Sequence, residues 1–197
     1  MATALILASA SPRRRELLAQ TGIPFTVDAS DVPEIPTAGE SAATFAQRVA
    51  RAKAVAVAQR HPDAFVLGAD TVVVLDATLF GKPLDRADAR RMLRALSGRA
   101  HHVLTAVALV EPGAGVHEVV VDSIVEFRQL TATEIEAYCA TAEPYDKAGA
   151  YALQGAAGGF VTTVRGSRTN VIGLPLEEVT ELLRRHLPRE LGAQPRA

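Results

Sequence analysis

A carboxylate within a long apolar run is the strongest sign of chemistry in this sequence. Asp70 lies in the middle of FVLGADTVVVL, residues 65–75, a stretch typical of a buried β-strand. Burying an ionised carboxylate among valines is unfavourable unless a cation or hydrogen-bond donors compensate. Asp70 is therefore predicted to be a metal ligand or a general base. The alternative is a turn aspartate between two shorter strands.

A second carboxylate, Glu34, lies in the proline-rich loop 28–39. Hard divalent cations such as Mg²⁺ bind to one or two carboxylates together with phosphate oxygens of the substrate. Glu34 is therefore a candidate to share a metal ion with Asp70.

An arginine-rich string predicts an anion site at a strand-to-helix junction. In residues 9–15, SASPRRR, Ser11 has the position of a helix cap and Pro12 that of the first helical residue. A helix N-terminus attracts anions, and basic side chains in its first turn oppose the helix dipole. Three arginines there favour a bound phosphate, with an ordinary capped helix and solvated arginines as the alternative.

Lysine is rare in this chain. Only Lys53, Lys82 and Lys147 occur among 21 basic residues. A lysine supplies a compact point charge on a flexible stem, which arginine does not. Lys53 borders the apolar face of a predicted helix, Lys82 lies in the turn Gly81-Lys82-Pro83, and Lys147 lies in the string 143–155. Together with the arginines they could neutralise a polyphosphate, or they could be three surface lysines.

Several other kinds of site are not predicted. The chain has no G-x-x-x-x-G-K-[ST] loop, so it is not a P-loop NTPase. His101 and His102 are adjacent in a predicted strand and point to opposite faces, so at most one of them faces any site. Cys/His zinc-ligand spacing is absent. Cys139, the single cysteine, cannot form an internal disulfide and is predicted to pack in the core.

Periodicity and turn residues predict alternating strands and helices. The strands are expected at 4–8, 25–27, 65–75, 103–110 and 116–127, and the helices at 13–20, 41–59, 86–96, 131–140 and 176–187. The segment 143–175 is dense in glycine and polar residues, and the tail 188–197 is expected to be mobile.

Length and composition limit the class of protein. The 197 residues suffice for one sizeable α/β domain or two closely packed lobes. A net charge of -1 argues against a non-specific nucleic-acid binder. No run approaches the roughly 18 apolar residues of a membrane span, and the first apolar run is too short for a signal peptide. A cytoplasmic protein that binds neither nucleic acid nor membrane is expected.

Six separated strings resemble the Maf family of nucleotide pyrophosphatases. They occur in the family's order between residues 5 and 186: Ser9-x-Ser11-Pro12-Arg13-Arg14, Leu67-Gly68-Ala69-Asp70-Thr71, Gly81-Lys82-Pro83, Leu96-Ser97-Gly98, Glu143-Pro144-x-Asp146-Lys147-Ala148-Gly149 and Gly173-Leu174-Pro175-Leu176.

The resemblance implies a fold, a reaction and a site. The fold is the Maf/inosine-triphosphatase-like α/β fold, two lobes on a long mixed β-sheet flanked by helices with a central cleft, formed by residues 1–187 as a single domain. The reaction is hydrolysis of a nucleoside triphosphate to the monophosphate and pyrophosphate with a divalent metal, Mg²⁺ or Mn²⁺, in a protein expected to be a homodimer. Asp70 is implied as the proton acceptor, Asp70 and Glu34 as metal ligands, and the phosphate-binding residues as Ser9, Arg13, Arg14, Lys53, Lys82 and Lys147.

Three positions are implied to set the base preference. The dTTP/UTP branch of the family has the residues found here as Arg13, Thr71 and Gln154, whereas the 7-methyl-GTP branch has tryptophan, glutamine and glutamate. An amide such as Gln154 can both donate to and accept from a pyrimidine edge. One position departs from the family pattern, because Pro33 stands where an acidic residue often precedes the loop glutamate.

Two alternatives to a dTTP/UTP pyrophosphatase remain open. One is a Maf-like enzyme of different base preference, for 7-methyl-GTP or for modified pyrimidines. The other is a nucleotide-binding regulator of septum formation. A pure binder has no need for a carboxylate such as Asp70 beside Lys53 and Lys82, which favours the enzyme. The family's implied role is the removal of surplus or non-standard nucleotides.

Overall fold

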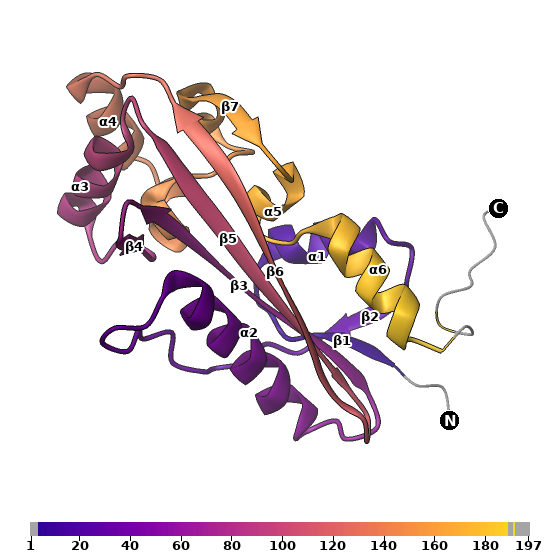
Figure 1. The fold of residues 1–197 in the computed structure, drawn as a ribbon. Helices are drawn as coiled ribbons and strands as arrows, with labels where there is room; N and C mark the ends of the chain where they lie inside the picture. The colour runs from indigo at the N-terminus through magenta and orange to yellow at the C-terminus, as the bar shows by residue number, and fades with distance from the viewer. Residues whose placement is uncertain (1–3, 189–190, 192–197) are drawn as a thin grey trace. The chain divides into compact units, whose positions relative to one another are not determined.

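The computed structural model describes residues 4–188 and 191 and contains a mixed β-sheet (Figure 1). Its seven strands run in the order β2-β1-β3-β5-β6-β7, with β4 paired to β3 off this path. β1 is parallel to β2 and β3, whereas β4 and β7 are antiparallel to their neighbours. The strands are β1 Leu5–Leu7, β2 Phe25–Val27, β3 Phe65–Leu75, β4 Thr78–Phe80, β5 Ala100–Glu111, β6 Gly115–Phe127 and β7 Val161–Arg165.

The described residues also form six α-helices. They are α1 Pro12–Ala19, α2 Ala42–Ala58, α3 Arg86–Leu96, α4 Ala132–Cys139, α5 Arg168–Ile172 and α6 Leu176–His186, with short 3-10 helices at Glu143–Asp146, Ala148–Ala150 and Ala156–Phe160. The predicted α/β class, a mixed sheet flanked by helices, is confirmed.

The predicted elements agree with the observed ones to within a few residues, apart from several short ones. β4, β7, α5 and the 3-10 helices, which have three to five residues each, were not predicted. β3 is continuous through Asp70, which rules out a turn aspartate between two strands. No helix among the described residues is long and apolar enough to cross a bilayer. The predicted mobile tail, 188–197, lies outside the described residues except at Pro188 and Leu191.

The chain divides into two compact units. Unit 1 comprises Met1–Asp70, Thr105–Val121 and Gly173–Ala197, and unit 2 comprises Thr71–Leu104 and Asp122–Ile172. The boundary therefore falls inside β3, between Asp70 and Thr71.

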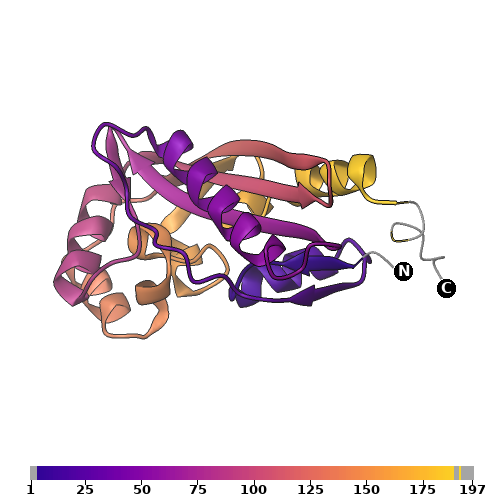
Figure 2. The ribbon, with the colours of Figure 1, turned by 90° about the horizontal axis from the view of Figure 1, so that it is seen from below.

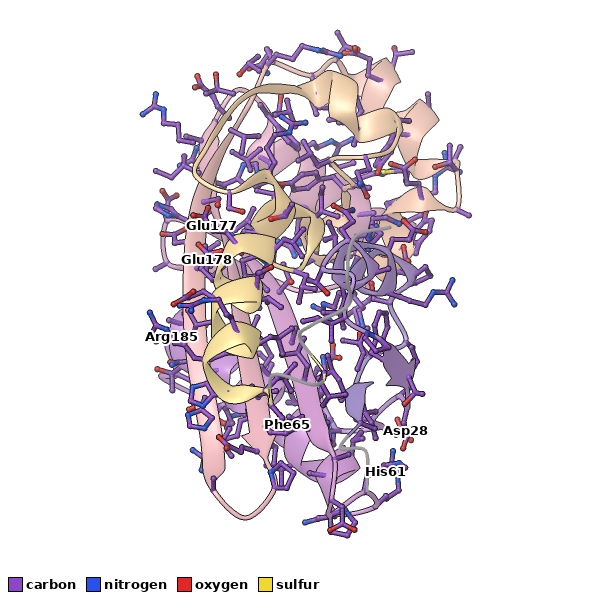
Figure 3. The ribbon with its side chains drawn as sticks, turned by 90° about the vertical axis from the view of Figure 1, so that its right-hand side faces the viewer. Asp28, His61, Phe65, Glu177, Glu178 and Arg185 are labelled. Atoms are coloured by element: carbon purple, nitrogen blue, oxygen red, sulfur yellow. The ribbon has the colours of Figure 1, made fainter. Side chains whose placement is uncertain are left out.

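Unit 1 packs helices on both faces of its strands. α2 lies on one face and α6 on the other, as Figure 1 shows; α2 is in front of the strands in Figure 2 and α6 in Figure 3. The side chains of Leu7, Val49 and Leu67 are completely buried between these layers. Burial of such residues supplies the main driving force for the packing.

Gly68 allows α2 to approach β3 closely. A Cβ at this position would lie 2.4 Å from the Ala50 carbonyl oxygen and 2.8 Å from the Ala54 nitrogen. Both atoms belong to helix backbone, which cannot move aside as the end of a side chain can.

We expect Gly68→Ala to force α2 away from β3. The variant should lose about 1–3 kcal/mol of unfolding free energy, the usual effect of overpacking, and it should also lose activity because Lys53 moves with α2. Urea denaturation with a steady-state assay measures both effects. Gly159→Ala is the matched control, since a Cβ there meets no atom within 4 Å. Equal stability of the two variants would contradict the close approach.

Unit 2 has its own core, which includes a buried histidine. The His101 ring packs edge-on against Phe127 and Tyr151, with centroid distances of 5.0 and 5.4 Å, and its Nε2 is 2.8 Å from the Tyr151 hydroxyl. His102 is exposed, which confirms that the two adjacent histidines face opposite ways. Cys139 is buried and unpaired, as predicted.

Acid should destabilise the protein through His101. Burial lowers the pKa of its imidazole from the ordinary 6.5 to about 4. Between these values the unfolded chain binds more protons than the folded one, so stability falls as the pH drops from 6.5 towards 4. The loss should be about 1.4 kcal/mol per pH unit and about 3 kcal/mol in total.

Urea midpoints at about pH 7 and about pH 5 measure this slope. His101→Gln removes the titrating group, so its stability should fall less on acidification than that of the wild type. Parallel pH profiles of the two proteins would show that His101 is not the group responsible.

Candidate active site

A buried lysine joins the two predicted carboxylates of unit 1. Lys53 Nζ donates to Asp70 Oδ1 at 2.8 Å and lies 2.6 Å from Glu34 Oε1. Lys53 and Asp70 are only 6% and 5% exposed, whereas Glu34 lies at the surface. The ammonium group offsets the cost of burying Asp70 and draws both carboxylates to one point. The sequence placed these three residues in one site, and the structure brings them together.

Three of the predicted phosphate-binding residues, Ser9, Arg13 and Arg14, lie at or just before the start of α1. The Ser11 hydroxyl caps the helix by accepting from the Arg14 backbone N–H at 3.4 Å. Buried Ser9 accepts through its hydroxyl from Arg14 Nη1 at 3.3 Å, and Arg14 Nε donates to the Gly173 carbonyl at 2.8 Å. Arg14 is thus fixed in place by the backbone of a distant motif.

Arg14 of α1 lies in the electrostatic field of the two carboxylates. Desolvation lowers the pKa of the Arg14 guanidinium, and the charges of Asp70 and Glu34 oppose this shift. The Nε atom of Arg13 is buried and has no hydrogen-bond partner among the described residues. A buried N–H without an acceptor is unfavourable by itself, and an anionic ligand would supply that acceptor.

One end of the Glu34 loop is tied to the C-terminal end of α2. Arg60 donates to the Asp28 carboxylate at 2.8 and 3.1 Å, and His61 Nε2 lies 2.8 Å from it (Figure 3). These hydrogen bonds lower the pKa of Asp28, and the one from Arg60 has a larger effect than the one from His61.

The other end of the loop is tied to the first half of α2. Arg48 donates to the Ile35 carbonyl at 3.0 Å and to both oxygens of Glu40 at 2.7 Å. The hydrogen bonds from Arg48 lower the pKa of Glu40 to about 2. The helix that carries Lys53 therefore also holds the backbone next to Glu34.

In unit 2 the predicted lysine turn lies beside the predicted lysine string. The Gly149 N–H donates to the Gly81 carbonyl at 3.0 Å, which joins the two motifs. Lys82 is exposed, whereas Lys147 is largely covered and donates to the Glu143 carbonyl at 2.7 Å. Thr71 is half-buried in β3.

Gln154 is exposed on a turn that the Glu143 carboxylate supports. This carboxylate accepts from the Tyr138 hydroxyl at 3.0 Å and from the Ala156 N–H at 3.1 Å. A Cβ at Gly155 would lie 2.0 Å from Glu143 Oε1, so a larger residue there would displace the Glu143 carboxylate. Glu143 therefore positions the turn next to Gln154, a role that the sequence pattern alone did not indicate.

The donor atoms of unit 1 suit a hard divalent cation. Asp70 and Glu34 each place a carboxylate oxygen beside the Lys53 ammonium group. The two carboxylates therefore lie close together, around a positive charge. Mg²⁺ and Mn²⁺ favour carboxylate oxygens and take their other ligands from phosphate and water.

A comparison with family models decides the family. The model described as "Maf-like protein" matches residues 4–186. The chain belongs to the Maf family. The resemblance noted from the six sequence strings is thereby confirmed, and Maf proteins generally use a divalent metal.

Close relatives of this Maf chain are named "dTTP/UTP pyrophosphatase". The protein from Myxococcus xanthus (strain DK1622) is 56% identical over 93% of this chain and 92% of its own length. Those from Geobacter sulfurreducens and Geobacter metallireducens are 54% and 52% identical over 92% and 91% of this chain, and over 95% and 94% of their own lengths.

Solved structures with more distant similarity were also found. A nucleoside-triphosphatase / dITP/XTP pyrophosphatase from Mycobacterium abscessus is 17% identical, with 96% of each chain covered and a TM-score of 0.45. A HAM1 protein from Coxiella burnetii is 19% identical, with 93% of this Maf chain and 99% of its own covered and a TM-score of 0.47.

Proposed function

We propose that this Maf protein hydrolyses dTTP and UTP to the nucleoside monophosphate and pyrophosphate. The relatives' shared name and the residues Arg13, Thr71 and Gln154 support this substrate choice. The observation that carries the reaction is the buried Lys53–Asp70 pair, 2.8 Å apart, in the same unit as an arginine-rich helix start. A carboxylate buried beside a lysine and arginines combines a base with groups that bind phosphate.

In this proposal Asp70 orients the attacking water and accepts its proton, as a general base. Lys53 holds the Asp70 carboxylate in place and faces the triphosphate with its positive charge. Arg13 and Arg14 bind phosphate oxygens at the start of α1, together with Ser9. Such fixed positive groups stabilise the charge that develops on the pyrophosphate leaving group.

The metal of the proposal is Mg²⁺ or Mn²⁺, held by Asp70 and Glu34 with phosphate oxygens. When bound, it would supply positive charge that offsets the charge of the triphosphate. Glu34 is set on a loop that is anchored at its two ends by Arg48 of α2 and by Arg60 just after α2, which supports its assignment as a ligand.

The proposal also gives roles to residues of unit 2. Lys82 and Lys147 would bind phosphate, and Thr71 and Gln154 would recognise the base, as the family resemblance implies. We also propose that residues 1–187 act as a single domain, that the protein is a homodimer in the cytoplasm, and that it removes surplus or non-standard nucleotides.

Exchanging the three specificity residues should change which nucleotide the enzyme prefers. We expect Arg13→Trp, Thr71→Gln and Gln154→Glu together to lower kcat/KM for dTTP and UTP by about 100-fold and to raise it for 7-methyl-GTP. A neutral amide suits a pyrimidine edge, whereas a carboxylate suits the cationic methylated guanine. Pyrophosphate release from dTTP, UTP, CTP, GTP, ATP and 7-methyl-GTP measures both changes.

The matched control is Gln129→Glu, which makes the same chemical change at a glutamine outside the proposed site. Its substrate profile should equal that of the wild type. If the triple variant keeps the wild-type preference for dTTP and UTP, these three residues do not select the base. If the wild type prefers 7-methyl-GTP, the proposed substrate is wrong and the reaction class stands.

A further inference from the structure

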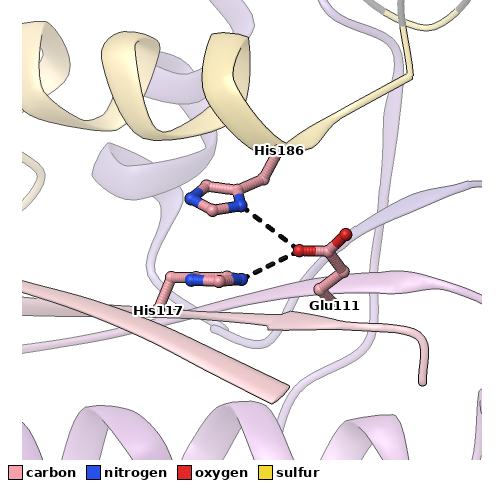
Figure 4. Close-up of side chains that lie close together, drawn as sticks. All are labelled: Glu111, His117 and His186. Atoms are coloured by element: carbon pink, nitrogen blue, oxygen red, sulfur yellow. Dashed lines mark hydrogen bonds and ion pairs between the residues drawn. The ribbon is translucent and has the colours of Figure 1, made fainter. Parts of the chain in front are cut away.

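A carboxylate and two imidazoles meet in unit 1 at the C-terminal end of α6. Glu111 ends β5, His117 lies in β6, and His186 is the last residue of α6. His117 Nε2 is 2.8 Å and His186 Nδ1 is 3.2 Å from the same oxygen, Glu111 Oε2 (Figure 4). None of these residues belongs to the proposed catalytic site.

The spacing of these three ligand atoms suits a tetrahedral metal ion. One nitrogen or oxygen atom from each side chain lies within 4.8 Å of the other two. Zinc bonds of 2.0–2.2 Å at tetrahedral angles place ligand atoms about 3.3 Å apart. The observed N···O distances of 2.8 and 3.2 Å are close to this value, so small side-chain movements would admit an ion.

The two imidazole rings are already arranged for joint binding. Their centroids are 3.5 Å apart and their planes differ by 24°, so the rings stack. In Figure 4 a nitrogen of each ring points to the same carboxylate oxygen. The three side chains are 25–31% exposed, which leaves the cluster reachable from solvent.

The local charges also favour a cation. The C-terminal end of a helix carries the negative end of its dipole, and His186 lies at the end of α6. The two arginines of the same turn, Arg184 and Arg185, both bond to Glu181, at 2.8 and 2.6 Å. That carboxylate offsets part of their positive charge.

We propose that Glu111, His117 and His186 bind one Zn²⁺ ion, with water in the fourth position. Two imidazoles and a carboxylate are ligands typical of zinc, whereas Mg²⁺ prefers oxygen ligands only. The ion would join the end of α6 to the β5–β6 hairpin. This zinc site is separate from the metal proposed for catalysis, and its existence does not depend on the proposed function.

Zinc titration of the tag-free protein against a chromogenic chelator tests the site. We expect one tightly bound equivalent of Zn²⁺, a rise in melting temperature with added zinc, and visible absorption bands of four-coordinate cobalt when Co²⁺ replaces zinc. The Asp70→Asn and Glu34→Gln variants should bind the same equivalent, because the ion does not use the catalytic carboxylates. A wild type without a tightly bound equivalent would overturn the proposal, as would loss of that equivalent in either carboxylate variant.

Single-ligand variants identify the residues. His117→Gln and His186→Gln should each weaken zinc binding by at least about 10- to 100-fold, since even indirect supporting groups contribute that much. His102→Asn is the matched control. His102 pairs with a single carboxylate, that of Asp122, and this ion pair does not include a second histidine. Circular dichroism checks that each variant is folded, and Glu111→Gln replaces any that is not. Unchanged zinc affinity in the folded ligand variants would refute the assignment.

Discussion

Replacing Asp70 by asparagine should lower kcat for pyrophosphate release by about 10²–10⁴-fold, the usual contribution of a general base. The asparagine side chain has the same shape, and its carbonyl oxygen can still accept from Lys53, so the fold should persist. Lys53 also keeps its contact with Glu34, 2.6 Å away. A stopped assay of pyrophosphate release, with urea denaturation in parallel, separates loss of chemistry from loss of structure.

The control for this variant is Asp76→Asn. Asp76 is a surface carboxylate of unit 2 that pairs with Arg99 at 2.9 Å, and its side chain is 71% exposed. Its removal should change the rate less than twofold, because exposed ion pairs contribute little. An Asp70→Asn enzyme that keeps more than a tenth of the wild-type rate would show that Asp70 is not the base.

Lys53→Met should abolish activity and also destabilise the protein. The substitution leaves Asp70 buried without the ammonium group that now lies 2.8 Å from it. Breaking a buried ion pair from one side typically destabilises by about 3–5 kcal/mol. We expect the lower end, about 3 kcal/mol, because the charge of Arg14 also acts on Asp70.

The double variant Lys53→Met with Asp70→Asn shows whether the pair itself is responsible. It no longer carries an uncompensated buried carboxylate, so it should regain part of the stability and none of the activity. Arg51→Met, on the same helix at a side chain that is 58% exposed, should change stability by less than about 0.5 kcal/mol. If Lys53→Met were as stable as Arg51→Met, the pair would not hold the site together.

Much of the site in unit 1 could be predicted from residue types alone. Asp70 stood out because an ionised group in an apolar strand needs a partner, and Lys53 because a rare lysine bordered an apolar helix face. The structure joins the two. The contact between Glu34 and Lys53 was harder to predict, because the Glu34 loop is held by the side chains of Arg48 in α2 and of Arg60 just after it.

Other features depend on tertiary contacts that no local pattern records. Arg14 is held by the Gly173 carbonyl, 159 positions away in the sequence. Glu143 was part of a recognised string, but its support of the turn at Gly155 follows from packing. The histidines of the proposed zinc site have no characteristic spacing, because its ligands come from three separate elements.

Product analysis of dTTP hydrolysis is the measurement that tests the central claim most directly. Purified protein with Mg²⁺ or Mn²⁺ should convert dTTP and water to dTMP and pyrophosphate in equal amounts, and the Asp70→Asn variant should not. Formation of dTDP and phosphate would place the cleavage at the wrong anhydride bond. No product from dTTP or UTP, with folded protein and either metal, would contradict the proposed function and favour a nucleotide-binding regulator.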